Sequence, residues 1–267
     1  MTGRFRGQFT GLPFGTAAEE YDRLRPGYPA DLVNAVLARA FPAGATDGAA
    51  VVTGAAVEAS AGTGIATRAF AARCIHVTAY EPDLQMAALA RIRCAGLPVH
   101  VEESRFEDAG AGGVPLVFSA QAWHWIDPAV RCDVAAGLLH RGGTLALFWT
   151  VDQLADAAVR AAVDEAYAAI APIAGWSADL ADETDPTARW PAAELVAHPA
   201  FTDVSAQLFR WERVLPANGF LAYLATHSPV LRLDDDTREQ LLAAVGDAVP
   251  DQVRLAEETT LYLASRG

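Results

Sequence analysis

Short apolar runs alternate with amphipathic stretches through residues 29–150 of the chain. Val51–Glu58 and Ile75–Tyr80 are apolar runs with β-branched residues, and Ile65–Arg73 between them carries apolar residues at helical spacing. Further helices are predicted at Pro29–Phe41, Pro82–Cys94 and Asp127–Leu139, and further strands at Val99–Glu103, Val114–Ser119 and Thr144–Thr150. Strands that alternate with helices in this way predict an α/β fold with a mostly parallel sheet and helices on both faces.

The pattern changes after Thr150. Val151–Pro199 is alanine-rich and helical, and an acidic loop at Asp179–Pro186 interrupts it. Ser205–Val214 then has the alternation of an antiparallel strand, with Phe209 and Trp211 on one face. Two helical stretches and a last strand follow at Asn218–Thr226, Asp236–Val249 and Thr260–Ala264. The second half therefore predicts helical insertions around a C-terminal pair of strands.

A turn of small residues, Ala59–Gly64, joins the first strand to its helix. Glycines let the backbone turn sharply and leave room for a ligand against the main chain. Glu81, at the end of the next strand, can accept both hydrogen bonds of a ribose diol. The stretch therefore predicts a nucleoside-binding site.

Three details narrow the kind of nucleoside. A dinucleotide-binding fingerprint would have its third glycine at position 67, which is Thr67. Glu58 would repel a pyrophosphate, whereas it suits a ligand that carries an ammonium group. The chain has no lysine and no phosphate-binding G-x-x-x-x-G-K loop. These details argue against a ligand held by its phosphates.

The sequence E-x-S-A-G-T-G from Glu58 to Gly64 resembles the first motif, (Asp/Glu)-x-G-x-G-x-G, of class I S-adenosylmethionine (SAM)-dependent methyltransferases, with Ser60 in place of the first glycine. The order of the strands resembles their Rossmann-like seven-stranded sheet, in which the last strand is antiparallel. The resemblance implies that SAM is the cofactor and S-adenosylhomocysteine (SAH) its product. It also implies cofactor contacts from Glu58, Ser60, Ala61, Gly62, Gly64, Glu81, Pro82 and Met86.

Other segments resemble a small-molecule branch of this family, the type 11 and type 25 methyltransferases. Phe14–Pro29 is similar to the branch pattern F-x-x-x-A-x-x-Y-D-x-x-R-P-x-Y-P. The likeness makes Tyr21 and Arg25 candidates for a lid that meets the SAM carboxylate. The alternative is an arm that packs on the domain and leaves Arg25 in solvent.

Cofactor contacts are also implied after the third and fourth strands. Phe106 and Glu107 follow the third strand, where members of the family contact adenine. Ser119 and Gln121 lie at the end of the fourth strand, beside the point where ligands of open α/β sheets bind.

The loop after the fourth strand is rich in aromatic residues. Ala120–Asp127 resembles the branch pattern A-x-A-x-H-W-x-(Asp/Asn). His124 is a candidate general base, because histidine titrates near neutral pH. The alternative is that His124 orders the loop or touches SAM from the side. The neighbouring tryptophans can form an aromatic wall for the sulfonium.

The resemblance also gives a division of the single domain. Residues 1–28 are expected to form the N-terminal arm or lid, and residues 29–150 the SAM-binding core. Residues 151–200 and 217–250 are expected to be insertions that cover the substrate. Residues 201–216 and 256–265 are expected to form the C-terminal strand pair.

Composition limits the partners. The net charge of −13 repels phosphate backbones, so a nucleic-acid partner is not expected. No apolar run reaches the ~20 residues of a membrane span, and the three scattered cysteines suit a cytoplasmic protein. The histidines have no metal-ligand spacing, so no metal site is expected. The expected partner is a small-molecule substrate, and the protein is expected to be a monomer or a homodimer.

The sequence therefore predicts a SAM-dependent methyltransferase that acts on a small molecule, with O-, N- or C-methylation left open. A non-catalytic SAM-binding protein and a cyclase that uses SAM as a structural cation are alternatives. A nicotinamide-dependent oxidoreductase is a further alternative, against which Thr67 and Glu58 argue.

Overall fold

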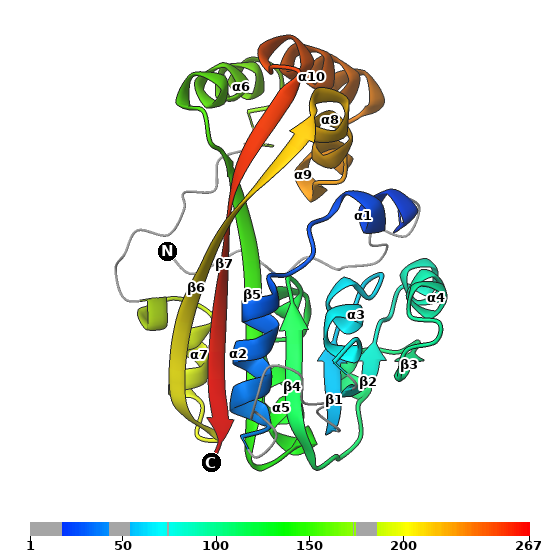
Figure 1. Cartoon of the computed structure of the whole chain (residues 1–267), viewed down its shortest axis with the longest axis vertical. Coiled ribbons are helices and arrows are strands. Elements are labelled where there is room, and N and C mark those ends of the chain that lie inside the picture. Colours follow the sequence, from blue (N-terminus) through cyan, green and yellow to red (C-terminus); the bar gives the residue numbers. More distant parts are fainter. Residues whose placement is uncertain (1–17, 43–53, 74, 173, 175–185) are drawn as a thin grey trace.

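A seven-stranded sheet runs through the protein in a computed structural model that describes residues 18–42, 54–73, 75–172, 174 and 186–267 (Figure 1). The strand order is β3-β2-β1-β4-β5-β7-β6. The strands are β1 (Gly54–Ala59), β2 (Ile75–Tyr80), β3 (Val99–Glu102), β4 (Val114–Ala120), β5 (Leu139–Leu154), β6 (Phe201–Pro216) and β7 (Gln252–Arg266). β1 to β5 are parallel, and β7 is antiparallel to both of its neighbours, β5 and β6. The predicted α/β fold with an antiparallel last strand is confirmed.

The centre of the sheet is apolar on both faces. Three consecutive residues of β4, Leu116, Val117 and Phe118, are fully buried. Parallel strands are covered by helices on both sides, so their sequences are continuous apolar runs rather than alternating ones. This is why the central strands were recognisable from the sequence.

Helices cover the two faces of this core. α2 (Ala30–Ala40), α3 (Ile65–Ala71) and α4 (Leu84–Arg93) lie on one face, and α5 (Arg131–Leu138) and α7 (Ala192–Ala197) on the other. Phe70 of α3 is buried against Phe118 and Phe148, with ring centroids 4.3 and 6.3 Å away. On the opposite face, Trp123 is buried in the same apolar cluster as Leu195 of α7.

A helical cap, defined as α6 (Ala157–Ile170), α8 (Ala217–Ala225), α9 (Ser228–Leu231) and α10 (Asp235–Ala248), packs at the far ends of β5, β6 and β7. The three strands extend from the core into the cap (Figure 1). Pairing of β5 with β7 continues to Leu154 and Leu255, and pairing of β6 with β7 continues to Pro216 and Gln252. The cap therefore rests on an extension of the sheet.

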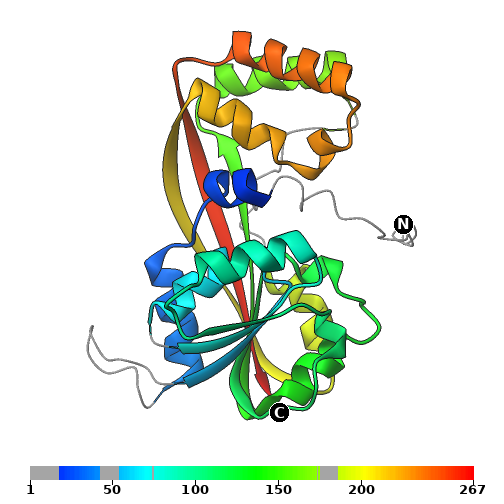
Figure 2. The ribbon, with the colours of Figure 1, turned by 90° about the vertical axis from the view of Figure 1, so that its right-hand side faces the viewer.

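The short helix α1 (Ala18–Leu24) lies between the core and the cap (Figure 2). Tyr21 packs on Met86 of α4, and Leu24 belongs to the apolar cluster of the cap. The N-terminal segment thus contacts both parts of the molecule.

Several boundaries differ from those expected. β5 continues four residues beyond Thr150, because β7 supplies backbone partners as far as Leu255. Within the expected first insertion, α6 belongs to the cap, whereas α7 packs on the core. The expected features at residues 1–17, 51–53 and 179–185, together with Cys74, lie outside the described residues. None of the described helices is long and apolar enough to cross a membrane.

Candidate active site

The turn between β1 and α3 has the backbone conformation that the glycine motif predicts. Ser60, Gly62 and Gly64 have φ values of 56°, 60° and 81°. These lie in the left-handed region, which costs a residue with a side chain roughly 1–2 kcal/mol. The turn forms nevertheless with Ser60 in place of the first glycine. A Cβ atom on Gly62 would have no protein atom within 4 Å, so the main chain is open to a ligand there.

Glu81 is hydrogen-bonded to this turn. The Gly62 N–H donates to Glu81 Oε2 at 2.7 Å, and the Asp83 N–H donates to Oε1 at 2.9 Å. The side chain is buried, and burial raises the pKa of Glu81 although the two backbone bonds oppose this. Each carboxylate oxygen has a second lone pair, so both retain capacity for the hydroxyls of a ribose. The residue that was expected to hold the ribose therefore lies against the glycine turn.

Glu58 lies beneath the same turn and is bonded to Thr67. The Thr67 hydroxyl donates to Glu58 Oε2, and both residues are buried. Burial raises the pKa of Glu58 to about 8. From the sequence, Thr67 served only as evidence against a dinucleotide fingerprint. Its role as the hydrogen-bond partner of Glu58 was not predicted. No motif spacing signals this pair.

The residues expected near the adenosine differ in how they are used. Met86 is buried beneath α1, whereas Pro82 is exposed. Phe106, in the short 3-10 helix η2 (Phe106–Asp108), is buried between Tyr80 and Trp123, with ring centroids 6.3 and 6.2 Å away. The Phe106 ring therefore packs in the core.

Glu107 bonds to two neighbouring groups. Its Oε1 accepts from Arg105 Nη2 at 2.6 Å and from the Asp127 N–H at 3.2 Å. This carboxylate therefore ties η2 to the loop that follows β4.

The end of β4 is held by two of the expected site residues. The Ser119 hydroxyl donates to the Ala59 carbonyl at 3.1 Å and is buried. Gln121 has a φ of 60°, and its Nε2 donates to the Thr150 carbonyl at 2.8 Å. These bonds join the ends of β1 and β4 to each other and to Thr150 within β5, at the edge of the sheet where α/β ligands bind.

His124 lies in η3 (Trp123–Trp125), directly after β4. Its ring is 4.8 Å from the ring of Trp125 and 6.4 Å from that of Trp190. Loss of water around the ring and the Arg131 charge lower the pKa of His124, although the residue keeps part of its surface in solvent. The lowered pKa favours the neutral imidazole, which is the form that can accept a proton.

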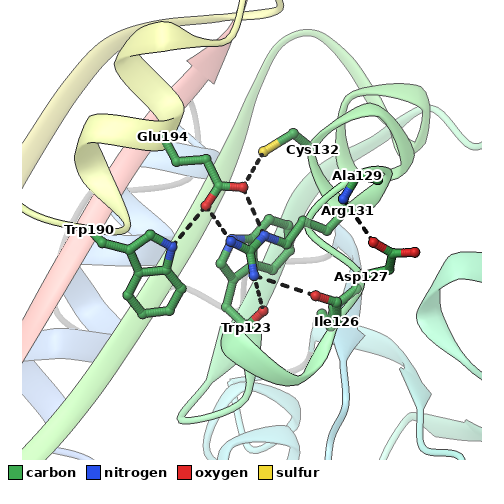
Figure 3. A network of polar contacts seen from close by, with 8 residues as sticks. All are labelled: Trp123, Ile126, Asp127, Ala129, Arg131, Cys132, Trp190 and Glu194. Atoms are coloured by element: carbon green, nitrogen blue, oxygen red, sulfur yellow. Dashed lines mark hydrogen bonds and ion pairs between the residues drawn. The ribbon is translucent and has the colours of Figure 1, made fainter. Parts of the chain in front are cut away.

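A network centred on Arg131 and Glu194 holds this loop (Figure 3). The Arg131 guanidinium donates to both Glu194 oxygens, at 2.8 and 2.5 Å, and to the Trp123 carbonyl at 2.8 Å. Trp190 Nε1 donates to Glu194 Oε2 at 2.9 Å, and the Cys132 thiol donates to Oε1 at 3.4 Å. The pair thus connects α5 and α7 to the segment that carries His124. No motif in the sequence indicates this pair.

Tyr21 and Arg25 lie at the boundary with the cap. Arg25 Nη2 donates to the Thr226 carbonyl at 3.0 Å, and its guanidinium lies over the rings of Tyr21 and Tyr223, 5.1 and 5.4 Å from their centroids. Arg25 is therefore partly buried rather than solvated. The neighbouring Asp22 pairs with Arg68 and Arg93 of the core, at 2.8 and 3.0 Å, and so anchors α1.

The structure thus brings the glycine turn, Glu58, Glu81, Ser119 and Gln121 to one edge of the sheet, with His124 beyond β4 and with Tyr21 and Arg25 towards the cap. In the described part of the chain, no group of three or more His, Cys, Asp or Glu side chains is arranged to hold a metal ion.

Glu194→Gln is expected to lower the free energy of unfolding by about 1–3 kcal/mol, because a buried guanidinium loses its charged partner. Urea denaturation followed by tryptophan fluorescence measures this change. Glu103→Gln is the matched control, since the Arg91–Glu103 pair is exposed on both sides and is worth about 0–1 kcal/mol. Equal losses in the two variants would contradict a structural role for Glu194.

Glu58→Gln is expected to alter the pH dependence of stability. The folded pKa of about 8 lies above the unfolded value of 4.5, so the folded state holds a proton that the unfolded state loses between these values. The wild-type free energy of unfolding therefore falls with rising pH across this window, by up to about 1.4 kcal/mol per unit from this group. Glutamine keeps an acceptor for Thr67 and does not titrate, so the variant should show a shallower fall in urea denaturation at pH 5.5, 6.5 and 7.5. Parallel pH dependences would refute the assignment.

Comparison with known proteins agrees with this geometry. Residues 57–147 match the family model described as a methyltransferase domain. An uncharacterized methyltransferase of Mycobacterium tuberculosis is 28% identical over 259 residues, which cover 94% of this chain and 91% of the relative. A type II methyltransferase from Anaeromyxobacter dehalogenans has a similar structure, with a TM-score of 0.65 and 23% identity over 91% of this chain and 97% of that one.

A more distant structure has the same fold. Phosphoethanolamine N-methyltransferase 2 of Haemonchus contortus, solved with SAM, has a TM-score of 0.51 and 13% identity over 98% of this chain and 58% of its own. The strand order, the glycine turn and the matched domain together indicate a class I SAM-dependent methyltransferase.

Proposed function

We propose that the protein transfers the methyl group of SAM to a small-molecule acceptor that binds between the edge of the sheet and the cap. The observation that carries the proposal is the bond between Glu81 and the Gly62 N–H, which sets a carboxylate suited to a ribose diol beside an open main chain. The net charge of −13 favours small or cationic acceptors over nucleic acid.

The residues of the turn fit SAM in several ways. Glu81 suits the ribose diol, and the open backbone at Gly62 suits the methionyl part of the cofactor. Arg25 and Tyr21 are proposed to meet its carboxylate, and Trp125 is proposed to supply aromatic surface near the sulfonium. Trp123, which was also expected in this wall, is fully buried in the core and has no surface to offer a ligand. Thr67 stands where a dinucleotide-binding turn would have its third glycine, which disfavours a nicotinamide cofactor.

When bound, SAM supplies a methyl group that its positive sulfur already activates. The protein's contribution is then to align the acceptor, to exclude water and, where the acceptor is a hydroxyl or an acidic carbon, to remove a proton. His124 is the proposed base, because a histidine can accept a proton near neutral pH and this one lies just after the end of β4. The Arg131–Glu194 pair is proposed to fix the loop that carries it.

Glu81→Ala is expected to weaken SAM binding by roughly 1–3 kcal/mol, through the loss of two hydrogen bonds to the ribose. Calorimetric titration with SAM, SAH and NADH in parallel measures this. Glu102→Ala is the control, because Glu102 ends the neighbouring strand and bonds to the exposed His100. Unchanged affinity would remove Glu81 from the site, and binding of NADH alone would refute the proposed function.

His124→Ala is expected to lower turnover by about 10²–10⁴-fold while SAM affinity stays unchanged, if His124 is the base. Radiolabelled methyl transfer to an acceptor found by screening measures turnover, and calorimetry measures the affinity. His100→Ala, on the exposed side of β3, is the control. A fall in SAM affinity with little further loss of turnover would instead make His124 part of the cofactor wall.

A further inference from the structure

Two carboxylates lie side by side on the extension of the sheet beneath the cap. Asp152 of β5 and Glu257 of β7 are directly opposite each other in the antiparallel ladder, and Trp211 of β6 is opposite Glu257. Residues that are directly opposite point to the same face of a sheet, and like charges in this arrangement are destabilising. The pair therefore costs folding stability unless a positive group compensates it.

Each of these carboxylates has one oxygen that no protein group satisfies. Glu257 Oε1 accepts from Arg213 Nε at 2.7 Å, and the Asp152 carboxylate is hydrogen-bonded to Tyr223 of α8. Glu257 Oε2 and Asp152 Oδ2 are buried without a partner. The Glu257 side chain has no exposed surface. A buried carboxylate oxygen without a donor is costly, so these two atoms indicate that a ligand provides the donors.

The charges of two nearby cations, Arg213 and Arg25, act on both carboxylates, and some of the N–H groups of these cations bond elsewhere. Arg213 Nη1 donates to the Leu24 carbonyl of α1, and its guanidinium lies 4.4 Å from the ring centroid of Tyr223. Arg25 donates to the Thr226 carbonyl, and its guanidinium also lies over the ring of Tyr223. His227 is half-buried beside Tyr223, and loss of water around the ring, with the charges of Arg25 and Arg213, lowers its pKa to about 3, which disfavours its charged form. Arg25 Nε and Arg213 Nη2 are also without partners, which defines a competing possibility, an anionic ligand.

The position of the pair is on the acceptor side of the site. Phe148 of β5 is opposite Ala120, the last residue of β4, and Asp152 lies four residues further along the strand. In an extended strand this is on the order of 13 Å beyond the edge of the sheet where the cofactor turn lies. α1 and α8 cover the same face, since Leu24 and Tyr223 belong to one apolar cluster with Leu154 and Leu255.

We propose that Asp152 and Glu257 bind the ammonium group of the methyl acceptor, so that the substrate class is small amines with an aromatic or apolar body; this inference rests on the proposed function. An ammonium has three donors and no acceptor, which matches two neighbouring carboxylate oxygens. Tyr223 and Trp211 provide the aromatic surface beside them. The acidic net charge attracts a cation and repels the competing anion.

The test is calorimetric titration of the full-length protein, saturated with SAH, with three probes of similar shape and different charge. These probes are 2-phenylethylamine, 2-phenylethanol and 3-phenylpropionate. The amine is expected to bind at least about tenfold more tightly than the alcohol or the carboxylate, because only the amine supplies a cation to the two free oxygens. Tighter binding of the carboxylate, equal binding of all three, or no binding of the amine would overturn the proposal.

Substitution of the two carboxylates tests whether they cause the preference for the amine. Asp152→Asn and Glu257→Gln are each expected to abolish the preference for the amine while SAH affinity is unchanged. Glu258→Gln is the matched control, because Glu258 is the adjacent buried glutamate and pairs with Arg210 instead. Thermal unfolding of each variant shows whether it is folded. If Glu257→Gln does not fold, Asp152→Asn alone tests the proposal. A preference that survives in both folded variants would overturn the proposal.

The same titrations distinguish failure of the proposed function from failure of the ammonium site. Absence of SAH binding to the wild-type protein would refute the proposed function. Binding of SAH without a preference for the amine would refute only the ammonium site. Loss of SAH affinity in Asp152→Asn and Glu257→Gln would assign the two carboxylates to the cofactor and overturn their role in acceptor binding.

Discussion

The antiparallel insertion of β7 between β5 and β6 is the constraint on which the cap and the acceptor side of the site depend. β1, β2 and β4 end at the edge of the sheet where the cofactor turn begins, as parallel strands of an α/β sheet do. β7 runs in the opposite direction, and its first residues pair with β5 and β6 beyond that edge. The resulting three-stranded extension gives α6, α8 and α10 an apolar surface and sets Asp152 opposite Glu257. One strand thus positions both the cover and its polar groups.

The sequence was sufficient for the core because its elements are defined locally. β1, β2 and β4 are apolar runs, and the helices between them have apolar residues at helical spacing. The end of β5 could not be predicted in this way, because it depends on backbone partners from β7 at the other end of the chain. The helix α1 was not predicted, for a similar reason. A seven-residue helix has little stability of its own, and here the pairing of Asp22 with Arg68 and Arg93 holds it.

The candidate site divides along the same line. The glycine turn and Glu81 were predictable, because a short motif marks the turn and an acid ends the next strand. The bond from Thr67 to Glu58, the pairing of Arg131 with Glu194 and the juxtaposition of Asp152 with Glu257 have no motif. They join residues from different elements, so only the fold reveals them. The residues that hold the expected site in place are thus less predictable from sequence than those expected to touch the cofactor.

The buried acids share a physical logic. Glu58 is in register with Phe118 on β4, and through Phe148 this face of the sheet continues to Asp152 and Glu257. Burial raises the pKa of all three carboxyl groups, since removing a charge from water is costly. A cation bound against such a group recovers part of that cost, whereas an anion adds to it. A face lined in this way therefore favours cationic ligands, in line with the proposed binding of SAM near Glu58 and of an amine near Glu257. Aligning two such ligands demands fixed charges and excluded water more than a catalytic triad.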